Sequence, residues 1–599
     1  MTGRLLQTSR NQGSGILESS VAVVVPSEGH LVHRLAVALI AFEGILLVAV
    51  ALLRGQHPPG HDELNFLEIG LRMLGTRGNP QTFIHGSLFY DLMAGLHGVT
   101  YFLRGVIGYG WESSAYLESY IEYRDIFLLV GRLIVVMFSI SLLVAVYRLA
   151  QVLYGKDAGL LAIALLSFGV VLPLTGTCLK EDLPASMLAT LSVLLLCDAS
   201  IGLRLLARWS LAGALYGVAV AAKYTIVPLV IVPLIIVLCV KTESPGRLLV
   251  RFMMAAGATF LTVEPYIVVE FPRAVEAFQK IRGHHFSGGT IRAIAPRFLG
   301  DYLPLGLGVP LVCGILAAAA KALFCEDMRP KAIVAYLAVM GAIFMWTTGG
   351  MPRYVITLAP LACVVFAGEI CRWRALPVRQ GIALIGLALL LTWPANILSL
   401  KFIALLSRPD TRHQAQAWIE TAVPSGSRVL LEGTVSGEPT FTPALVPTEG
   451  WFEARLVEVR AAGTTGQIVA AAAVHAAKSG HPRYDLLEKA VQDVPDLKGV
   501  DYLVLSEHHS LPDERIRIVK PEDPDIQSWI RSREAAMGLV EREFIQLFSI
   551  SPIPDLRFDW FDRPDYWRLW SAPLQNYQNW KLGPIIKVYR RRSVGAVGT

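Results

Sequence analysis

The sequence has little charge and no organised cysteine pattern. Only 17% of its 599 residues are charged, whereas 53% are hydrophobic, a composition far from that of a soluble globular chain. Its seven cysteines include no CxxC pair and none follows Cys371, which argues against a disulfide framework in the last third of the chain and against a cysteine-based zinc site. The net charge of +6 is modest and no basic tract is present, so nucleic acid is not an expected partner.

No cleavable leader is expected. The first 30 residues are polar, and the first apolar run, at 34–53, is long enough to remain in a membrane as an anchor. We therefore expect residues 1–33 to form a cytoplasmic tail.

Apolar stretches near the roughly 20 residues needed to cross a bilayer recur up to about residue 400 and then stop. The sequence therefore predicts a multi-span α-helical membrane protein with about 11 transmembrane helices in a domain at 34–400. The expected spans are 34–53, 126–147, 158–178, 184–203, 209–222, 224–240, 252–270, 304–324, 332–346, 354–371 and 380–400.

Basic residues favour one orientation of these spans. With the N-terminus in the cytoplasm, every cytoplasmic turn carries Lys or Arg, as the positive-inside rule requires. The loops at 55–125 and 271–303 and the residues after 400 then lie on the outer face of the plasma (inner) membrane. The stretch 83–107 is long enough to span but would invert all later loops, so we interpret it as an interfacial helix.

From Lys401 the pattern changes to short helices and strands, which predicts a soluble α/β domain at 401–599 on the outer face. Four tryptophans interleave with charges between 558 and 580, a pattern typical of a membrane interface, a sugar-stacking surface or a small satellite core. Strands are expected at 427–431, 501–506, 544–550 and 584–590, and helices at 409–423, 484–493 and 524–540.

The adjacent acids Asp62 and Glu63 lie a few residues beyond the first span, where charge at the rim of a bilayer is costly unless a function retains it. The segment HDELNFLEIGLRML that contains them predicts an amphipathic helix along the outer membrane surface. The simpler interpretation is that Asp62 caps this helix and Glu63 complements its dipole.

Further charged residues fall on the same outer face. In a chain with so little charge, acids and bases that converge on one face indicate a site that handles an anion and transfers a proton. Each one alone could instead be a side chain that reaches back to the membrane interface. These candidate binding residues are His85, Lys180, Asp182, Lys223, Arg282, His284, His285 and Arg353.

Several segments in order resemble the membrane glycosyltransferases of the C superfamily, in the branch of the protein O-mannosyltransferases and the lipid A aminoarabinose transferase. The resemblance covers nearly the whole chain and rests on order and spacing. The segments are the Asp-Glu pair after a single span, NPQTFIHGSLFYDL (79–92), KEDLPASMLATLSVLL (180–195), GVAVAAKYTIVPLVIVPL (217–234), GMPRYVITLAPLACVVFAG (350–368) and DTRHQAQAWIETAVPSGSRVLLEG (410–433).

The resemblance implies a cavity open to lipid, faced by the first outer loop, and a polyprenyl-phosphate-linked sugar donor. It maps the catalytic base to Asp62, with Glu63 as the adjacent candidate, and maps further site positions to Asp182, Lys223 and Arg353. The chain departs from the family in two places: the usual His-Pro-Pro-Leu is HGSL at 85–88, and Leu64 and Asn65 replace the aromatic residue that is common directly after Asp-Glu. The way in which the sugar donor fits this part of the cavity is therefore expected to differ from that in other family members.

The residue types suit glycosyl transfer to a lipid, glycan or protein acceptor. A carboxylate can take the proton of the attacking group, and cations in a water-poor pocket stabilise the departing lipid phosphate. One-step displacement would invert the anomeric configuration. Asp62, Glu63 and Asp182 could share a divalent cation, although nothing in their spacing demands a cofactor.

Two other classes of function stay open. A transporter or flippase of lipid-linked sugars would also place charges in an outer cavity, but it would normally show inverted repeats, and none is apparent. A non-catalytic membrane scaffold that binds glycans or partner proteins predicts that Asp62 is dispensable.

Overall fold

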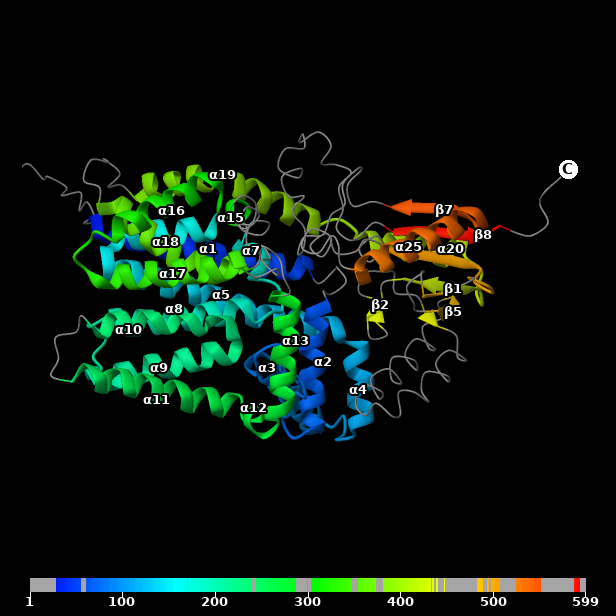
Figure 1. Ribbon diagram of the computed structural model, residues 1–599, viewed down its shortest axis with the longest axis horizontal. Helices are drawn as coiled ribbons and strands as arrows, with labels where there is room; N and C mark the ends of the chain where they lie inside the picture. Colours follow the sequence, from blue (N-terminus) through cyan, green and yellow to red (C-terminus); the bar gives the residue numbers. More distant parts are fainter. Residues whose placement is uncertain are drawn as a thin grey trace, which may run out of the picture.

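A computed structural model of the chain describes residues 28–54, 61–169, 171–238, 244–286, 299, 303–346, 354–372, 381–432, 434–435, 438–439, 446–447, 482–487, 493–494, 497–506, 524–550 and 586–592. These residues form a helical bundle and, beyond one end of it, a smaller unit built on a β-sheet (Figure 1). Residues 1–27 of the expected tail and the tryptophan-rich segment 558–580 lie outside the described residues.

Six of the described helices are long and apolar enough to cross a membrane. A seventh span results if the apolar pair Gly381–Trp393 and Ala395–Ala422, bent by 78°, is counted as one. The described part of the chain is thus a helical membrane protein, and the count of about 11 spans stays a prediction. The six helices are α1 (Glu28–Arg54), α5 (Arg124–Tyr154), α9 (Leu205–Ala222), α11 (Pro245–Val263), α17 (Met328–Trp346) and α18 (Val355–Arg372).

The other expected spans correspond to shorter or interrupted helices. The stretch 158–178 is not one helix, because the α-helix ends at Ser167 and only one short helix precedes the turn at 176–181. The stretch 304–324 is divided at Gly308, whose φ of 93° lies in the left-handed region. These elements are α6 (Lys156–Ser167), α7 (Val171–Thr175), α8 (Asp182–Cys197), η1 (Tyr224–Val230), α10 (Ile231–Val237), α15 (Leu303–Leu307), α16 (Val309–Ala322) and α19 (Gly381–Leu406).

The expected span 252–270 is displaced towards the N-terminus, since α11 ends at Val263, where Glu264 and Pro265 follow. Its packing against α9 is close because α9 presents two glycines. A Cβ atom on Gly213 would lie 2.1 Å from the Phe252 carbonyl oxygen, and one on Gly217 would lie 2.2 Å from that of Ala256. Small residues let two helix backbones approach in this way.

Five helices form a separate group at one end of the bundle. In Figure 1 α2, α4 and α13 stand across the direction of the bundle helices, as expected of helices that lie along a membrane surface. The segment 83–107 gives the helix α3, which is not among those long and apolar enough to span. The group comprises α2 (His61–Gly75), α3 (Ser87–Val106), α4 (Ser113–Glu122), α12 (Tyr266–Val269) and α13 (Phe271–Phe286).

The second unit contains a six-stranded sheet of order β4-β5-β1-β6-β8-β7. The strands β4, β5, β1 and β6 are parallel, whereas β8 is antiparallel to both of its neighbours. A short hairpin of β2 and β3 stands apart from it. The strands are β1 (Arg428–Leu431), β2 (Thr434–Val435), β3 (Glu438–Pro439), β4 (Val446–Pro447), β5 (Arg483–Leu487), β6 (Tyr502–Ser506), β7 (Phe544–Ile550) and β8 (Ile586–Arg591).

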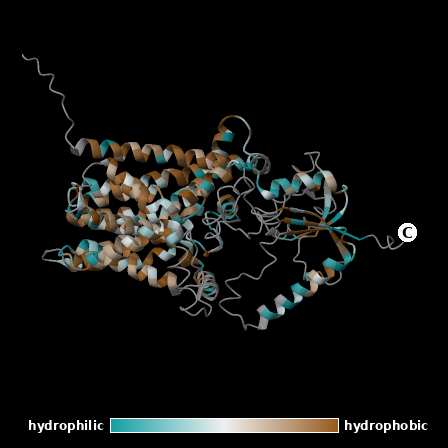
Figure 2. Cartoon of the chain, turned by 90° about the horizontal axis from the view of Figure 1, so that it is seen from above, coloured by the Kyte–Doolittle hydropathy of each residue, from teal (hydrophilic) through white to brown (hydrophobic). Residues whose placement is uncertain are grey.

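Two helices, α20 (Thr411–Ala422) and α25 (Pro524–Glu543), pack on opposite faces of this sheet. Ile419 of α20 joins the buried cluster on one face with Val429, and Val540 of α25 joins the other with Leu430, as the alternation of a strand dictates. Figure 2 shows apolar strands between polar helices in this unit, in contrast to the broadly apolar bundle.

The sheet corrects one expectation. The helix predicted at 484–493 is wrong over 484–487, because residues 483–487 form β5, which is hydrogen-bonded between β4 and β1. Residues 488–492 lie outside the described residues. The predicted strands at 427–431, 501–506, 544–550 and 584–590 and the helices at 409–423 and 524–540 are all present within a few residues. The location of this unit on the outer face stays a prediction.

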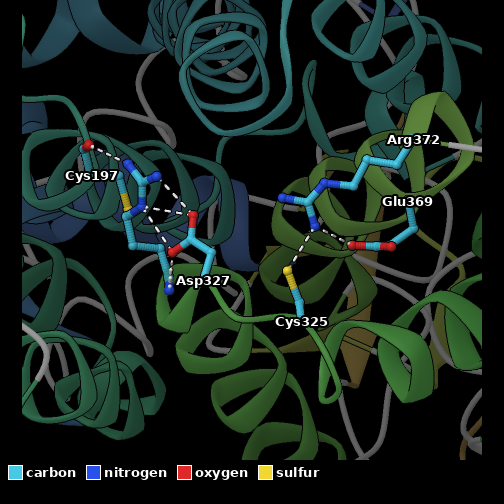
Figure 3. A network of polar contacts seen from close by, with 6 residues as sticks. Cys197, Cys325, Asp327, Glu369 and Arg372 are labelled. Atoms are coloured by element: carbon cyan, nitrogen blue, oxygen red, sulfur yellow. Dashed lines mark hydrogen bonds and ion pairs between the residues drawn. The ribbon is translucent and has the colours of Figure 1, made fainter.

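The end of the helical bundle that lies away from the sheet carries charged residues. Several of them belong to turns that the sequence predicts to be cytoplasmic. Arg329 donates to both oxygens of Asp327 and to the Cys197 carbonyl oxygen. Arg372 donates to Glu369 and to the Cys325 sulfur (Figure 3). The contact between Cys325 and Arg372 joins two of the predicted cytoplasmic turns, those that precede the predicted spans 332–346 and 380–400.

Candidate active site

Residues 177–182, the last five residues between α7 and α8 together with the first residue of α8, contact several other elements at the opposite end of the bundle. Its Thr177 carbonyl oxygen accepts a hydrogen bond from Arg54 at the end of α1, at 3.4 Å. Its Leu179 N–H donates to Glu63 of α2, at 3.0 Å. Its two acids bind the segment before α3 and the end of α9. We call these six residues the 177–182 turn.

Glu63 is held by a buried arginine. Arg132 of α5 donates from Nε to Oε1 at 3.0 Å and from Nη2 to Oε2 at 2.8 Å, and both side chains are buried. Such paired parallel hydrogen bonds are the strong geometry of an arginine and a carboxylate. Burial alone would raise the pKa of Glu63, but the guanidinium of Arg132, with Arg54 and the Leu179 N–H, lowers that pKa to about 2.

Glu63 is therefore an ionised anchor whose oxygens are occupied by the protein, which is unsuited to accepting a proton from substrate. It fixes the first turn of α2 against α5 and the 177–182 turn. Asp62 is the preceding residue of that same turn, and its side chain lies outside the described part of the structure.

Lys223 follows α9 directly and is buried against the second acid of the turn. Its ammonium nitrogen contacts the Asp182 carboxylate, lies 4.0 Å from Oε1 of Glu181, and stands 4.5 Å from the centroid of the Tyr354 ring at the start of α18. An aromatic face and a carboxylate together stabilise a cation away from water. Side chains of the 177–182 turn and of the start of α18 thus fix the position of one positive charge at the end of α9.

His85 completes the contacts of the 177–182 turn. Its Nδ1 lies 3.2 Å from Oε1 of Glu181, and its ring centroid lies 5.4 Å from that of Phe66 on α2. Burial would raise the pKa of Glu181, but the His85 imidazole and the Lys223 ammonium hold it below its ordinary value. His85 is partly exposed, so it is an accessible member of the group.

The sequence HGSL at 85–88, which replaces the His-Pro-Pro-Leu that is usual in the family, has a structural reason. A Cβ atom on Gly86 would lie 2.1 Å from the Ala221 carbonyl oxygen and 2.7 Å from that of Ala222, the last residue of α9. Only glycine fits such a close backbone approach. The next residue, Ser87, donates from its backbone N–H to Glu264 and from its hydroxyl to the Val263 carbonyl oxygen at 2.7 Å.

Glu264 is a second buried acid of this end of the bundle, just beyond α11. It also accepts a hydrogen bond of 3.1 Å from the Tyr224 hydroxyl. Burial raises the pKa of Glu264 to about 7, although its bonds from Ser87 and Tyr224 oppose the increase. Burial likewise raises the pKa of Asp91, whose carboxylate accepts from the Ser87 hydroxyl at 3.3 Å, to about 6.

The structure thus brings His85, Asp182, Lys223 and Glu63 around one turn. Lys180 belongs to the same turn and is half-buried. Arg282, His284 and His285 lie in α13, but their side chains are outside the described residues, and all of Arg353 is outside them.

Sequence reasoning missed Arg132 and Arg54. Both carried a signal, since an arginine inside or at the end of an apolar span is costly and calls for a partner. The partners themselves, a carboxylate on another helix and a backbone carbonyl, have no signature in the sequence.

Among the described residues, no group of three or more His, Cys, Asp or Glu side chains is arranged to hold a metal ion. Of the three acids considered for a divalent cation, Glu63 and Asp182 are each bound by a protein cation. A shared ion with Asp62 stays an untested prediction.

Residues 128–268 match the family model described as dolichyl-phosphate-mannose-protein mannosyltransferase. The matched segment includes Arg132, the 177–182 turn, Lys223 and Glu264, and ends before α13. The predicted resemblance to the membrane glycosyltransferases is confirmed by this match, and the class of enzyme predicted from it, a glycosyltransferase, is the class of the matched family. The particular family that the chain resembles over this segment is that of the protein mannosyltransferases.

Solved structures are similar in overall form only. ArnT from Cupriavidus metallidurans, bound to undecaprenyl phosphate, is 13% identical, with 79% of this chain and 93% of that one covered and a TM-score of 0.47. The apo oligosaccharyltransferase of Archaeoglobus fulgidus is 12% identical, with 93% and 88% covered and a TM-score of 0.45. The arabinofuranosyltransferase AftD from mycobacteria is 13% identical, with 92% and 39% covered and a TM-score of 0.42.

None of the curated proteins compared with the chain matches it.

Proposed function

We propose that the protein is an integral membrane glycosyltransferase that moves a sugar from a polyprenyl-phosphate donor to a lipid, glycan or protein acceptor on the outer face of the plasma membrane. The observation that carries this proposal is the 177–182 turn. It ties Glu63, His85 and Lys223 from three separate elements together, and it lies within the segment that matches the mannosyltransferase family.

Asp62 is the proposed general base. It precedes Glu63 in the first turn of α2, whose position the bonds from Arg132 and Leu179 determine. A carboxylate within hydrogen-bond reach of an acceptor hydroxyl or amine can take its proton as that group attacks the anomeric carbon. In this proposal Glu63 is a positioning residue, because its own oxygens are already bound.

Lys223 is the proposed stabiliser of the leaving group. When the bond from the anomeric carbon to the phosphate oxygen breaks, negative charge grows on the lipid phosphate, and a cation already in place needs no reorganisation to meet it. Asp182 and the Tyr354 ring hold the ammonium at one position. Lys180, Arg282, His284, His285 and Arg353 are the other proposed phosphate or substrate contacts.

Transfer in a single displacement inverts the anomeric configuration of the sugar. The product of a reaction with a donor of known anomeric configuration therefore reports on the mechanism. A retained configuration would exclude a one-step displacement with Asp62 as base, even if sugar were transferred.

The proposal is tested with the full chain reconstituted in liposomes and supplied with a radiolabelled polyprenyl-phosphate sugar and candidate acceptors. An enzyme converts label to a new product. A flippase only moves the labelled lipid between leaflets, and a scaffold binds without either change. Label that crosses the bilayer with no acceptor modified, across donors and acceptors of all three classes, would replace the proposal by the flippase. Parallel reactions with a chelator test the dependence on a divalent cation.

A further inference from the structure

The C-terminal half of α3 exposes an apolar stripe that the proposed site does not use. Val99, Phe102, Leu103 and Val106 are between 49% and 62% exposed. Their spacing of i, i+3, i+4 and i+7 places them on one face of the helix. The chain then continues through three more exposed apolar side chains, Ile107, Tyr109 and Trp111. We call the four residues of α3 the stripe and these three the tip.

The tip is folded back on the helix in a fixed arrangement. The Tyr101 hydroxyl donates to the Trp111 carbonyl oxygen, and the Trp111 ring centroid lies 5.9 Å from that of Phe102. A Cβ atom on Gly105 would lie 2.4 Å from the Trp111 ring, so the indole covers this glycine directly. A rigid frame with its apolar side chains turned outward is an interaction surface.

The opposite side of α3 is packed into the protein. His97 is fully buried, with Nδ1 at 3.0 Å from the Tyr116 hydroxyl and Nε2 at 3.1 Å from the Leu67 carbonyl oxygen. The His97 ring also stacks on Phe127 of α5, with centroids 5.1 Å apart. The outward direction of the stripe is therefore set by contacts with α2, α4 and α5.

The position of α3 indicates what covers the stripe. Phe66 of α2 contacts Phe89 of α3, and four residues further on Gly70 meets Met93, so α3 runs beside α2. Because α2 stands across the bundle helices at their end (Figure 1), α2 and α3 both run across the direction of the spans, which is the orientation of helices that lie along a membrane surface. An apolar face exposed on such a helix is suited to contact with lipid.

The composition fits the same surroundings. Residues 92–111 contain no acid, and Arg104 is their one Lys or Arg. Tyr and Trp side chains such as Tyr109 and Trp111 are enriched where hydrocarbon meets headgroups. Phosphate-bearing lipids would repel an acidic surface but not this one.

We propose that the stripe and the tip insert into the lipid leaflet at this end of the bundle and anchor α3, and with it α2, at headgroup depth. This inference goes beyond the proposed reaction, because it requires no catalytic activity and stands if that reaction is wrong. It assigns to the surface one partner, the acyl chains and glycerol region of phospholipids.

The test places p-benzoylphenylalanine at Phe102 or Val106 in the full chain, reconstituted in nanodiscs of phosphatidylethanolamine and phosphatidylglycerol. Irradiation is expected to give a phospholipid adduct by mass spectrometry at both positions. Phe42, which is 57% exposed on α1, is the positive control, and Ile545, which is 44% exposed on β7, is the matched negative control. Adducts with protein, or none where Phe42 gives one, would overturn the proposal.

A second measurement uses a conservative variant of the native chain. In vesicles of brominated phosphatidylcholine, tryptophan fluorescence is quenched by contact with the acyl chains. Trp111→Phe is expected to remove part of the quenchable fluorescence. An unchanged quenchable fraction in the folded variant would show that the tip lies in water and would contradict the proposal.

Discussion

Arg132 of α5 donates two parallel hydrogen bonds to Glu63 of α2, and both side chains are buried. This pair joins a membrane-spanning helix to a helix that lies across the end of the bundle. Because Glu63 also accepts from the Leu179 N–H, the pair reaches the turn that carries Asp182. Asp62 is one residue before Glu63 in the same helical turn, so these bonds also fix its backbone position.

Replacing Glu63 by Gln should destabilise the protein. Removing one partner of a buried ion pair leaves an uncompensated charge and costs about 3–5 kcal/mol, whereas replacing both partners by apolar residues of similar size is often neutral. We expect a lower midpoint of thermal unfolding at pH 7 for Glu63→Gln and a partial recovery for Glu63→Leu combined with Arg132→Met. Transfer activity should stay lost in the double variant.

The exposed acid Glu112, at the start of α4, supplies the control Glu112→Gln, which should match the parent. Because the pKa of Glu63 is lowered in the folded state to about 2, its stabilising effect is present above pH 4.5 and is lost as the pH falls towards 2. A full-strength effect of Glu63→Gln at pH 2 would contradict this assignment.

Glu264 should make the protein less stable as the pH rises. Its folded pKa of about 7 lies above the ordinary value of 4.5, so the folded state binds more protons between these values. The free energy of unfolding therefore falls from about pH 4.5 to about pH 7 and is then constant with respect to this group. The midpoint of thermal unfolding, measured across this pH range, should change less with pH in Glu264→Gln than in the parent.

Asp91 shares the Ser87 contact, and its pKa is also raised, to about 6. Asp91→Asn is therefore the matched comparison. It should remove a smaller part of the decrease in stability with pH, and the part that it removes should end near pH 6. Equal slopes in the parent and in Glu264→Gln would show that Glu264 is ionised throughout.

Gly86→Ala should disrupt the end of α9, because the added methyl group would meet the Ala221 carbonyl oxygen at 2.1 Å. Overpacking of this kind costs about 1–3 kcal/mol. Gly95 lies in α3 with open space around its Cβ position, so Gly95→Ala should be neutral or stabilising by up to about 1 kcal/mol. Thermal unfolding and transfer activity of the two variants are compared directly, and equal behaviour would rule out the close approach.

Lys223→Met should reduce transfer strongly, by about 10²–10³-fold if Lys223 stabilises the leaving phosphate. Lys321, half-exposed at the other end of the bundle and 3.4 Å from Glu369, offers the control Lys321→Met. The double variant Lys223→Met with Asp182→Asn separates stability from chemistry, because it removes the unpaired Asp182 charge. Recovery of activity in that variant would mean that Lys223 has a structural role only.

The spacing of apolar residues predicted those helices and strands whose own sequence carries the pattern of the surface that they bury. The span at 126–147 lies within α5, and the strand at 501–506 is β6 almost to the residue. The sequence LLEKAV after Tyr484 has a helical pattern, yet residues 483–487 are a strand, since pairing with β1 and β4 overrides local preference.

The sequence predicted several residues of the candidate site but not the contacts that join them. Asp182 and Lys223 stood out as charges in an apolar chain, and the structure shows them in contact. The roles of the Thr177 carbonyl and the Leu179 N–H depend on backbone groups that every residue has. Likewise Gly86 reads as a departure from a family motif until the nearby carbonyl oxygen of Ala221 explains it.

The most direct test of the central claim is sugar transfer by Asp62→Asn, in the full chain, from a radiolabelled polyprenyl-phosphate sugar. The variant should bind the donor as the parent does and lose transfer by at least about 10²-fold, the scale of a general base. Glu112→Gln should retain full activity. Unaltered transfer by Asp62→Asn would contradict the assignment of Asp62 as the base.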